Sequence, residues 1–157
     1  MPAYPQWNAT RAKQIIAEHL DSEGPLLPIL HGIQEEFGYI DEAAEPLIAH
    51  ALNITRAEVH GVVTFYHDFR REPAGRHVLK LCHAEACQSA GGDSLAAQAE
   101  ARLGVRMGGR APDGSVTLEP VYCLGLCATA PSAMLDGRVV GRLNRSRLDA
   151  LLSEAQK

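Results

Sequence analysis

Four cysteines, grouped as two pairs, constrain this chain more than any other feature of its sequence. The first pair, Cys82 and Cys87, lies in "CHAEAC", and the second pair, Cys123 and Cys127, lies in "CLGLC"; the 157 residues contain no other cysteine. Four thiols at such spacings are typical of a metal or redox site. The fold therefore has to bring two distant segments to one place.

The sequence around the cysteines alternates between strand and helix patterns. Residues 77–82 and 115–123 predict strands that each lead directly into a cysteine, and residues 91–104 predict a helix between them. Strands joined in this way pair in parallel through a right-handed crossover. Both cysteine pairs are then expected just past the carboxyl ends of the strands, where open α/β sheets carry their ligands.

The rest of the second half predicts a hairpin and a final helix. Asp136-Gly137 marks the hairpin turn within residues 133–143. Ser146 and Asp149 predict a capping box for the last helix. In the second strand, Tyr122 is expected to share one face with the apolar positions before it.

The first half predicts short helices and no strand. Asn8 is a helix cap, Gly38 is placed to end a helix, and Thr55 with Glu58 forms a capping box. The segment 71–76, "REPAGR", predicts a linker. We therefore expect an α+β protein, with a helical docking domain over residues 1–75 and an α/β domain over residues 76–157.

Charge and hydropathy exclude several classes of function. Residues 1–76 hold 6 Lys and Arg against 11 Asp and Glu, so the helical half lacks the basic face of a nucleic-acid-binding protein. No apolar run approaches the roughly 20 residues of a membrane helix. The start, "MPAYPQWNAT", does not resemble a secretory signal. These features predict a cytoplasmic protein, in which cysteines bind metals or react more often than they form structural disulfides.

Three chemistries compete for the four thiols. A dithiol oxidoreductase would need C-x-x-C, whereas the spacings here are C-x4-C and C-x3-C. A structural zinc module with four cysteines remains an alternative, although its usual knuckle is C-x2-C. A 2Fe–2S cluster takes two thiolates on each of two irons, which matches the grouping into pairs.

Glycines beside the cysteines favour the cluster. Gly125, inside the second pair, suits a backbone with positive φ close to a sulfur atom. Gly91 and Gly92 follow Cys87 and begin the predicted helix 91–104, whose positive amino end would face the cluster.

Longer segments resemble a known family. "LCHAEACQSAGG" and "EPVYCLGLCATAPSAMLDG" are similar to the cysteine segments of the thioredoxin-like 2Fe–2S ferredoxins. "LLPILHGIQEEFGYI" and "ITRAEVHGVVTFYHDF" are similar to the helical amino-terminal region of the same family. The resemblance thus covers nearly the whole chain and implies a thioredoxin-like second domain with a mixed sheet.

The resemblance also implies a role. It implies that the cluster ligands are Cys82, Cys87, Cys123 and Cys127. It also implies a flavoprotein partner that carries FMN and reacts with NAD, so that this chain binds neither FMN nor NAD. "AEACQ" most resembles the gamma subunit of NAD-dependent formate dehydrogenase. The small 2Fe–2S subunit of NADH:quinone oxidoreductase (complex I) and diaphorase subunits of bidirectional hydrogenases are the alternatives. The chain would transfer electrons within such a complex, with no substrate chemistry, nucleic-acid binding or membrane insertion of its own.

Histidine side chains can also bind metal ions. His83 and His77 lie near the first cysteine pair in the sequence, but Rieske centres use histidine in place of cysteine, and here all four cysteines are present. His50, His60 and His67 are expected at the edge of the helical core.

Three other features carry open interpretations. The stripe "VVTFYHDF", residues 62–69, is either core or in part a surface for the flavoprotein. Pro131 occupies the loop where thioredoxin folds often hold a cis proline. The arginines near the carboxyl end form either a solvated surface or a docking face; they are Arg138, Arg142, Arg145 and Arg147.

Overall fold

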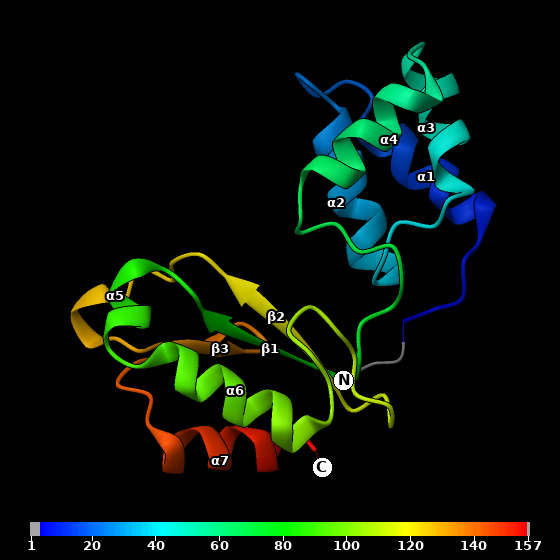
Figure 1. Ribbon diagram of the computed structural model, residues 1–157. Coiled ribbons are helices and arrows are strands. Elements are labelled where there is room, and N and C mark those ends of the chain that lie inside the picture. The colour runs from blue at the N-terminus through cyan, green and yellow to red at the C-terminus, as the bar shows by residue number, and fades with distance from the viewer. Residues whose placement is uncertain (1–3, 157) are drawn as a thin grey trace. The chain divides into compact units, whose positions relative to one another are not determined.

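The computed structural model describes residues 4–156, which form two compact units (Figure 1). The first unit ends at Pro73 and the second begins at Ala74. Each unit has its own hydrophobic core. None of the described helices is long and apolar enough to cross a membrane.

The first unit consists of four helices, whose ends follow from local sequence signals. The Asn8 side chain accepts hydrogen bonds from the first backbone N–H groups of α1, Gly38 ends α2 at φ 80°, and Thr55 and Glu58 form the predicted capping box of α4. The helices are α1 (Ala9–His19), α2 (Leu26–Phe37), α3 (Ala44–Leu52) and α4 (Arg56–Phe65).

The core of the helical unit is aliphatic with a few aromatic rings. Trp7, the one tryptophan of the chain, packs against Phe37 with ring centroids 5.0 Å apart, so its fluorescence reports on this core. The largest apolar side chains that are fully buried here are Phe37, Ile29, Leu30, Ile33, Ile40, Ile48 and Val59.

A buried carboxylate lies within this apolar core. The Glu45 side chain is fully buried, and Arg56 Nε and His60 Nδ1 each lie 3.1 Å from one of its oxygens. Arg71 also donates to this carboxylate through Nη1. A buried charge is tolerated when cationic hydrogen-bond donors surround it, so Glu45 ties α3 to α4 and to the segment that follows α4.

The second unit is a four-stranded mixed sheet with helices. The strand order is β2-β1-β3-β4, in which β1 and β2 are parallel, while β3 is antiparallel to both β1 and β4. The strands are β1 (His77–Cys82), β2 (Val116–Val121), β3 (Ala133–Leu135) and β4 (Arg138–Val140). The helices are α5 (Glu85–Ser89), α6 (Gly92–Leu103), the 3-10 turn η1 (Cys127–Thr129) and α7 (Arg145–Ala155).

Helices α6 and α7 lie side by side against the sheet (Figure 1). Alternate residues of the strands point into this core, which also takes the apolar stripes of both helices. The fully buried members are Leu79, Ala99, Val116, Leu118, Ala133, Leu148, Leu152 and Ala155. The α+β class and the mixed sheet predicted from the sequence are thus confirmed.

Several details of the second unit differ from the sequence-based predictions. Helix α7 is capped by the Asn144 side chain, which accepts from Arg147 N, and not by Ser146. Strand β2 ends at Val121, and Tyr122 is 75% exposed because the chain turns away there. The hairpin turn is as predicted, since Asp136 and Gly137 both have positive φ (49° and 86°).

Removal of the buried carboxylate tests its contribution to the helical unit. We expect Glu45→Ala to lower the free energy of unfolding by about 2 kcal/mol, because the buried carboxylate and its hydrogen bonds from Arg56, His60 and Arg71 are lost. The measurement is urea unfolding at pH 7 followed by Trp7 fluorescence. Glu42→Ala is the matched control, because Glu42 also pairs with Arg71 but is 77% exposed; it should cost less than about 1 kcal/mol.

The same pair of proteins tests the charge of Glu45. Burial acts to raise the pKa of Glu45, but hydrogen bonds from His60, Arg71 and Arg56 lower it by more, to below the usual 4.5. The stabilisation is therefore present above pH 4.5 and is lost as the pH falls through the lower pKa of the folded state. The stability difference between wild type and Glu45→Ala should shrink over that range; a difference independent of pH would contradict the ionic role.

Candidate metal centre

Parallel pairing of β1 with β2 brings the two cysteine segments together. Cys82, the last residue of β1, lies opposite Val121, the last residue of β2, and His83 N donates a 2.8 Å hydrogen bond to Val121 O. Cys123 follows two residues after the end of β2. Both cysteine pairs thus begin at one edge of the sheet, as the strand pattern predicted.

The first cysteine pair is buried. Cys82 is 5% exposed at the end of β1, and Cys87 is 1% exposed within α5. Sequence patterns did not predict α5, because it is a five-residue helix and too short to show a periodic stripe. It turns the C-x4-C segment so that Cys87 Sγ points inward.

The second cysteine pair is exposed. Cys123 has φ 98°, which is rare for a residue with a side chain, and its Sγ lies 3.6 Å from Cys127 Sγ. Gly125, at φ 75°, donates its backbone N–H to Cys123 Sγ at 3.3 Å. The predicted positive φ of Gly125 near a sulfur atom is therefore confirmed.

Glycines also fit the first pair into the fold. Gly91 has φ 91° and precedes α6. A Cβ added at Gly92 would lie 2.6 Å from Cys87 O and 3.6 Å from Cys82 O, so only glycine allows the start of α6 to approach the first pair this closely.

The electrostatic surroundings of Cys82 connect the two pairs. Burial acts to raise the pKa of Cys82, but several hydrogen bonds outweigh it and place the pKa below its usual value. The donors are the Ala84 backbone, the Cys87 side chain, the Cys123 backbone and the Ser132 side chain. Metal ligands bind as thiolates, so an environment that favours the thiolate suits a ligand.

Cys127 shows the opposite shift. Its pKa is raised, first by the hydrogen bond and the charge of Cys123, then by burial and by the charges of Cys87 and Cys82. Negative charge on the other three cysteines therefore disfavours a fourth thiolate at Cys127. Cationic iron relieves that repulsion, so the donor set fits a 2Fe–2S cluster with two thiolates on each iron.

Ser132 is a residue of this site that sequence reasoning missed. Its Oγ lies 3.5 Å from Cys87 Sγ, and its carbonyl accepts a 3.1 Å hydrogen bond from Cys82 N. It follows the Ala130–Pro131 bond, which is cis. The pairing of β1 with β3 places it there, and no local motif marks a serine that reaches across a sheet.

The histidines lie in varied positions. His77 stands at the far end of β1 from Cys82, and its Nδ1 lies 2.6 Å from Asp136 Oδ2. His83 Nδ1 lies 4.0 Å from Asp93 Oδ1, and its Nε2 is buried without a hydrogen-bond partner in the part of the chain that the structure describes. His60 contacts Glu45 in the other unit, where His50 and His67 are exposed.

Two of the carboxyl-terminal arginines make contacts within their own unit. Arg138 donates hydrogen bonds to the Glu154 carboxylate at 2.7 Å, and Arg147 donates to Gly141 O at 2.8 Å.

Among residues 4–156, no three or more His, Cys, Asp or Glu side chains are grouped so that they could hold one metal ion. The cysteines are thus arranged as two pairs.

The chain resembles known proteins in both sequence and structure. The sequence profile of the thioredoxin-like [2Fe-2S] ferredoxins matches residues 12–156. A subunit of the NADH-quinone oxidoreductase of Rhizobium meliloti (strain 1021) is 37% identical over 136 residues, which are 87% of this chain and 81% of that protein.

Hydrogenase subunits are also similar. The HndA subunit of the NADP-reducing hydrogenase of Solidesulfovibrio fructosivorans is 30% identical over 141 residues, 90% of this chain and 82% of that one. In the crystal structure of an NAD+-reducing [NiFe]-hydrogenase in the air-oxidized state, one chain superposes with a TM-score of 0.71 at 27% identity. The match covers 83% of this chain but 22% of the hydrogenase chain, so the resemblance concerns one part of that longer protein.

The difference in burial between the two pairs predicts different thiol reactivity in the cluster-free, reduced chain. We expect N-ethylmaleimide to label Cys123 about tenfold or more faster than Cys82 and Cys87, as read by mass spectrometry of peptides. Gly92→Ala should speed the labelling of Cys87, because the added Cβ forces α5 or α6 to move. Gly61→Ala is the control, since its Cβ would meet nothing within 4 Å. Equal rates at Cys87 and Cys123 in the wild type would contradict the described burial.

Proposed function

The chain belongs to the thioredoxin-like [2Fe-2S] ferredoxin family, and from this membership we propose that it is the electron-carrying subunit of an NAD-dependent oxidoreductase complex. In this proposal one 2Fe–2S cluster is held by Cys82, Cys87, Cys123 and Cys127. When bound, such a cluster accepts and releases one electron at a time. The observation that carries the proposal is the convergence of two cysteine pairs at one edge of the sheet.

The residues around the site have distinct tasks in this proposal. The buried pair, Cys82 and Cys87, anchors the site to the core, with Ser132 as a hydrogen-bond donor to the Cys87 thiolate. The exposed pair, Cys123 and Cys127, faces the surroundings of the unit, and Gly125 N–H stabilises negative charge on Cys123 Sγ. Electrons then enter and leave on the side of the exposed pair, because tunnelling partners need close approach.

Partners and cofactors follow from the proposed membership of a complex. Related proteins are named as subunits of NADH-quinone oxidoreductase and of hydrogenases. We infer a partner subunit that binds FMN and reacts with NAD, while this chain supplies the cluster and no substrate chemistry. The helical domain predicted over residues 1–75 would act as a docking domain. A cytoplasmic location belongs to the same proposal, since free cysteines persist more readily in a reducing compartment than in an oxidising one.

The complex itself is proposed to be an NAD-dependent formate dehydrogenase. The segment "AEACQ", residues 84–88, supports this choice through its resemblance to the gamma subunit of that enzyme. The named relatives favour a second candidate, in which the chain serves an NADH-quinone oxidoreductase or a hydrogenase.

Metal analysis of the full chain, purified without oxygen, tests the cluster. We expect about two iron and two acid-labile sulfide per chain, and a loss of both in Cys87→Ala and Cys127→Ala, because each iron would lose a thiolate. Ser132→Ala is the matched control: it removes the neighbour of Cys87 Sγ but no ligand, so iron and sulfide should stay. One zinc without sulfide would identify the structural zinc module instead, and wild-type iron in Cys127→Ala would refute the ligand set.

Isolation of the native complex tests the choice of enzyme. A tagged copy of the chain, purified from its own cells with its bound partners, should reduce NAD+ with formate and contain FMN. Cys123→Ala in the tagged copy should abolish this activity if electrons pass through the cluster. Reduction of quinone by NADH, or of NAD+ by hydrogen, with no response to formate would select the second candidate.

A further inference from the structure

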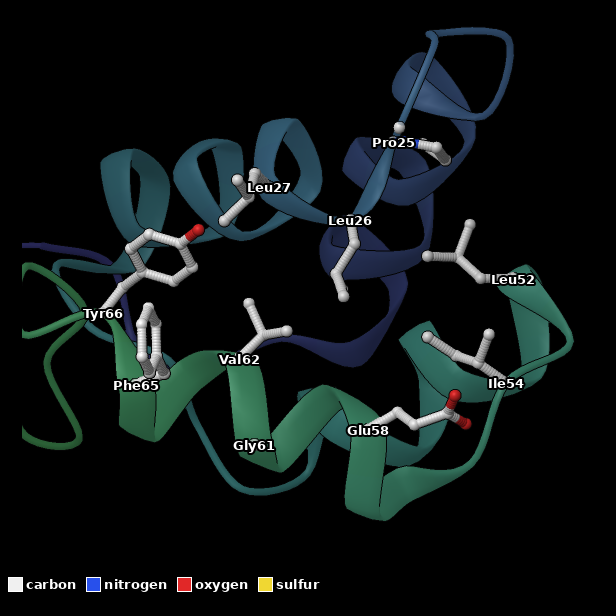
Figure 2. A pocket seen from close by; sticks show the side chains of 11 residues that line it. Pro25, Leu26, Leu27, Leu52, Ile54, Glu58, Gly61, Val62, Phe65 and Tyr66 are labelled. Carbon is white, nitrogen blue, oxygen red and sulfur yellow. The ribbon is translucent and has the colours of Figure 1, made fainter.

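A groove lined almost entirely by apolar side chains runs between three helices of the first unit (Figure 2). Its volume is about 790 Å³. In Figure 2, Leu26 and Val62 face each other across the middle, Phe65 and Tyr66 stand at one end, and Leu52 lies at the other. The remaining lining residues are Gly24, Pro25, Leu27, Ile54, Glu58 and Gly61.

Helix α4 presents a second apolar face to this groove. Val59 and Val63 fill the core of the unit, whereas Phe65 is 72% exposed and Tyr66 is 44% exposed beside it. Their rings pack edge to face with centroids 5.0 Å apart. Aromatic rings that are exposed next to a concave apolar surface are typical of interaction sites.

The shape of the groove suits a helix. Amphipathic helices dock into apolar channels between helices with side chains at positions i, i+3, i+4 and i+7. Gly61 lies on the wall formed by α4, and a Cβ there would meet nothing within 4 Å. The open space at Gly61 leaves room for an incoming side chain.

The acidic residues near the groove indicate which kind of helix would bind there. Glu58 is the charged residue among those that line it, and Glu23 adjoins the lining residue Gly24. The cation on α4, Arg56, is paired with buried Glu45. The amino end of α2 adds only a partial positive charge at this place, and the first 76 residues carry 11 acidic against 6 basic residues.

We propose that the groove binds an amphipathic α-helix of another protein, with apolar side chains in the groove and Lys or Arg residues beside them. A second copy of this chain fits less well, because its helical unit is acidic too. Helix α7 has arginines in its first turn, but it buries Leu148, Leu151 and Leu152 in its own core. The inference deepens the docking role proposed for this unit, and its test does not involve the cluster.

A synthetic peptide provides the probe. A fluorescein-labelled helix of about 18 residues, with leucine along one face and lysine along the rest, is titrated with the full-length chain and followed by anisotropy. A second peptide with glutamate in place of lysine has the same apolar face. We expect the lysine peptide to bind at least tenfold more tightly than the glutamate peptide, with an affinity that falls as salt is added.

Variants of α4 localise the binding. Gly61→Leu fills the groove and should weaken the lysine peptide about tenfold or more. Ala57→Leu adds the same side chain on the same helix outside the groove and should leave binding unchanged. Glu58→Gln keeps an acceptor for the capping box but removes the charge, and should weaken binding about two- to fivefold.

Several results would overturn the inference. These are no binding of the lysine peptide at about 1 mM, equal binding of the two peptides, or no effect of Gly61→Leu. Sedimentation that shows a wild-type dimer which Gly61→Leu dissociates would overturn it too, because the occupant would then be a second copy. The metal content of Gly61→Leu should equal that of the wild type, so failure here leaves the electron-transfer role standing.

Discussion

The parallel pairing of β1 with β2 is the constraint on which the rest of the second unit depends. It runs from His77 opposite Val116 to Cys82 opposite Val121, and so ends both strands at one edge. Leu79 and Leu118 hold this register, because a slip of one residue would turn buried side chains to the other face. The core that stabilises the sheet therefore also positions the cysteines.

The two cysteine pairs differ in burial, and this difference suits them to different roles. The first pair is enclosed by the end of β1, by α5 and by Ser132, whereas the second pair lies on an exposed loop with strained backbone at Cys123. A buried pair gives a fixed attachment with a low local dielectric, and an exposed pair gives access. A site built in this way suits electron exchange with a partner, since one side is rigid and the other is within reach.

Sequence reasoning recovered what local patterns encode. The strands that lead into cysteines, the Asp136-Gly137 hairpin, the capping box of α4 and the positive φ of Gly125 each follow from a short motif. It missed Ser132, the short helix α5 and the buried ion network of Glu45, because each depends on residues distant in the sequence or on too few residues to show a period. The predicted position of Tyr122 on the apolar face of the strand was also wrong, since strand alternation stops where the strand ends.

In the proposed site, two irons lie between the two cysteine pairs. A crystal structure of the anaerobically purified chain, with diffraction measured at the iron absorption edge, tests this most directly. We expect two iron peaks, one beside Cys82 and Cys87 and the other beside Cys123 and Cys127. A single metal peak among the four sulfur atoms, without an iron signal, would contradict it.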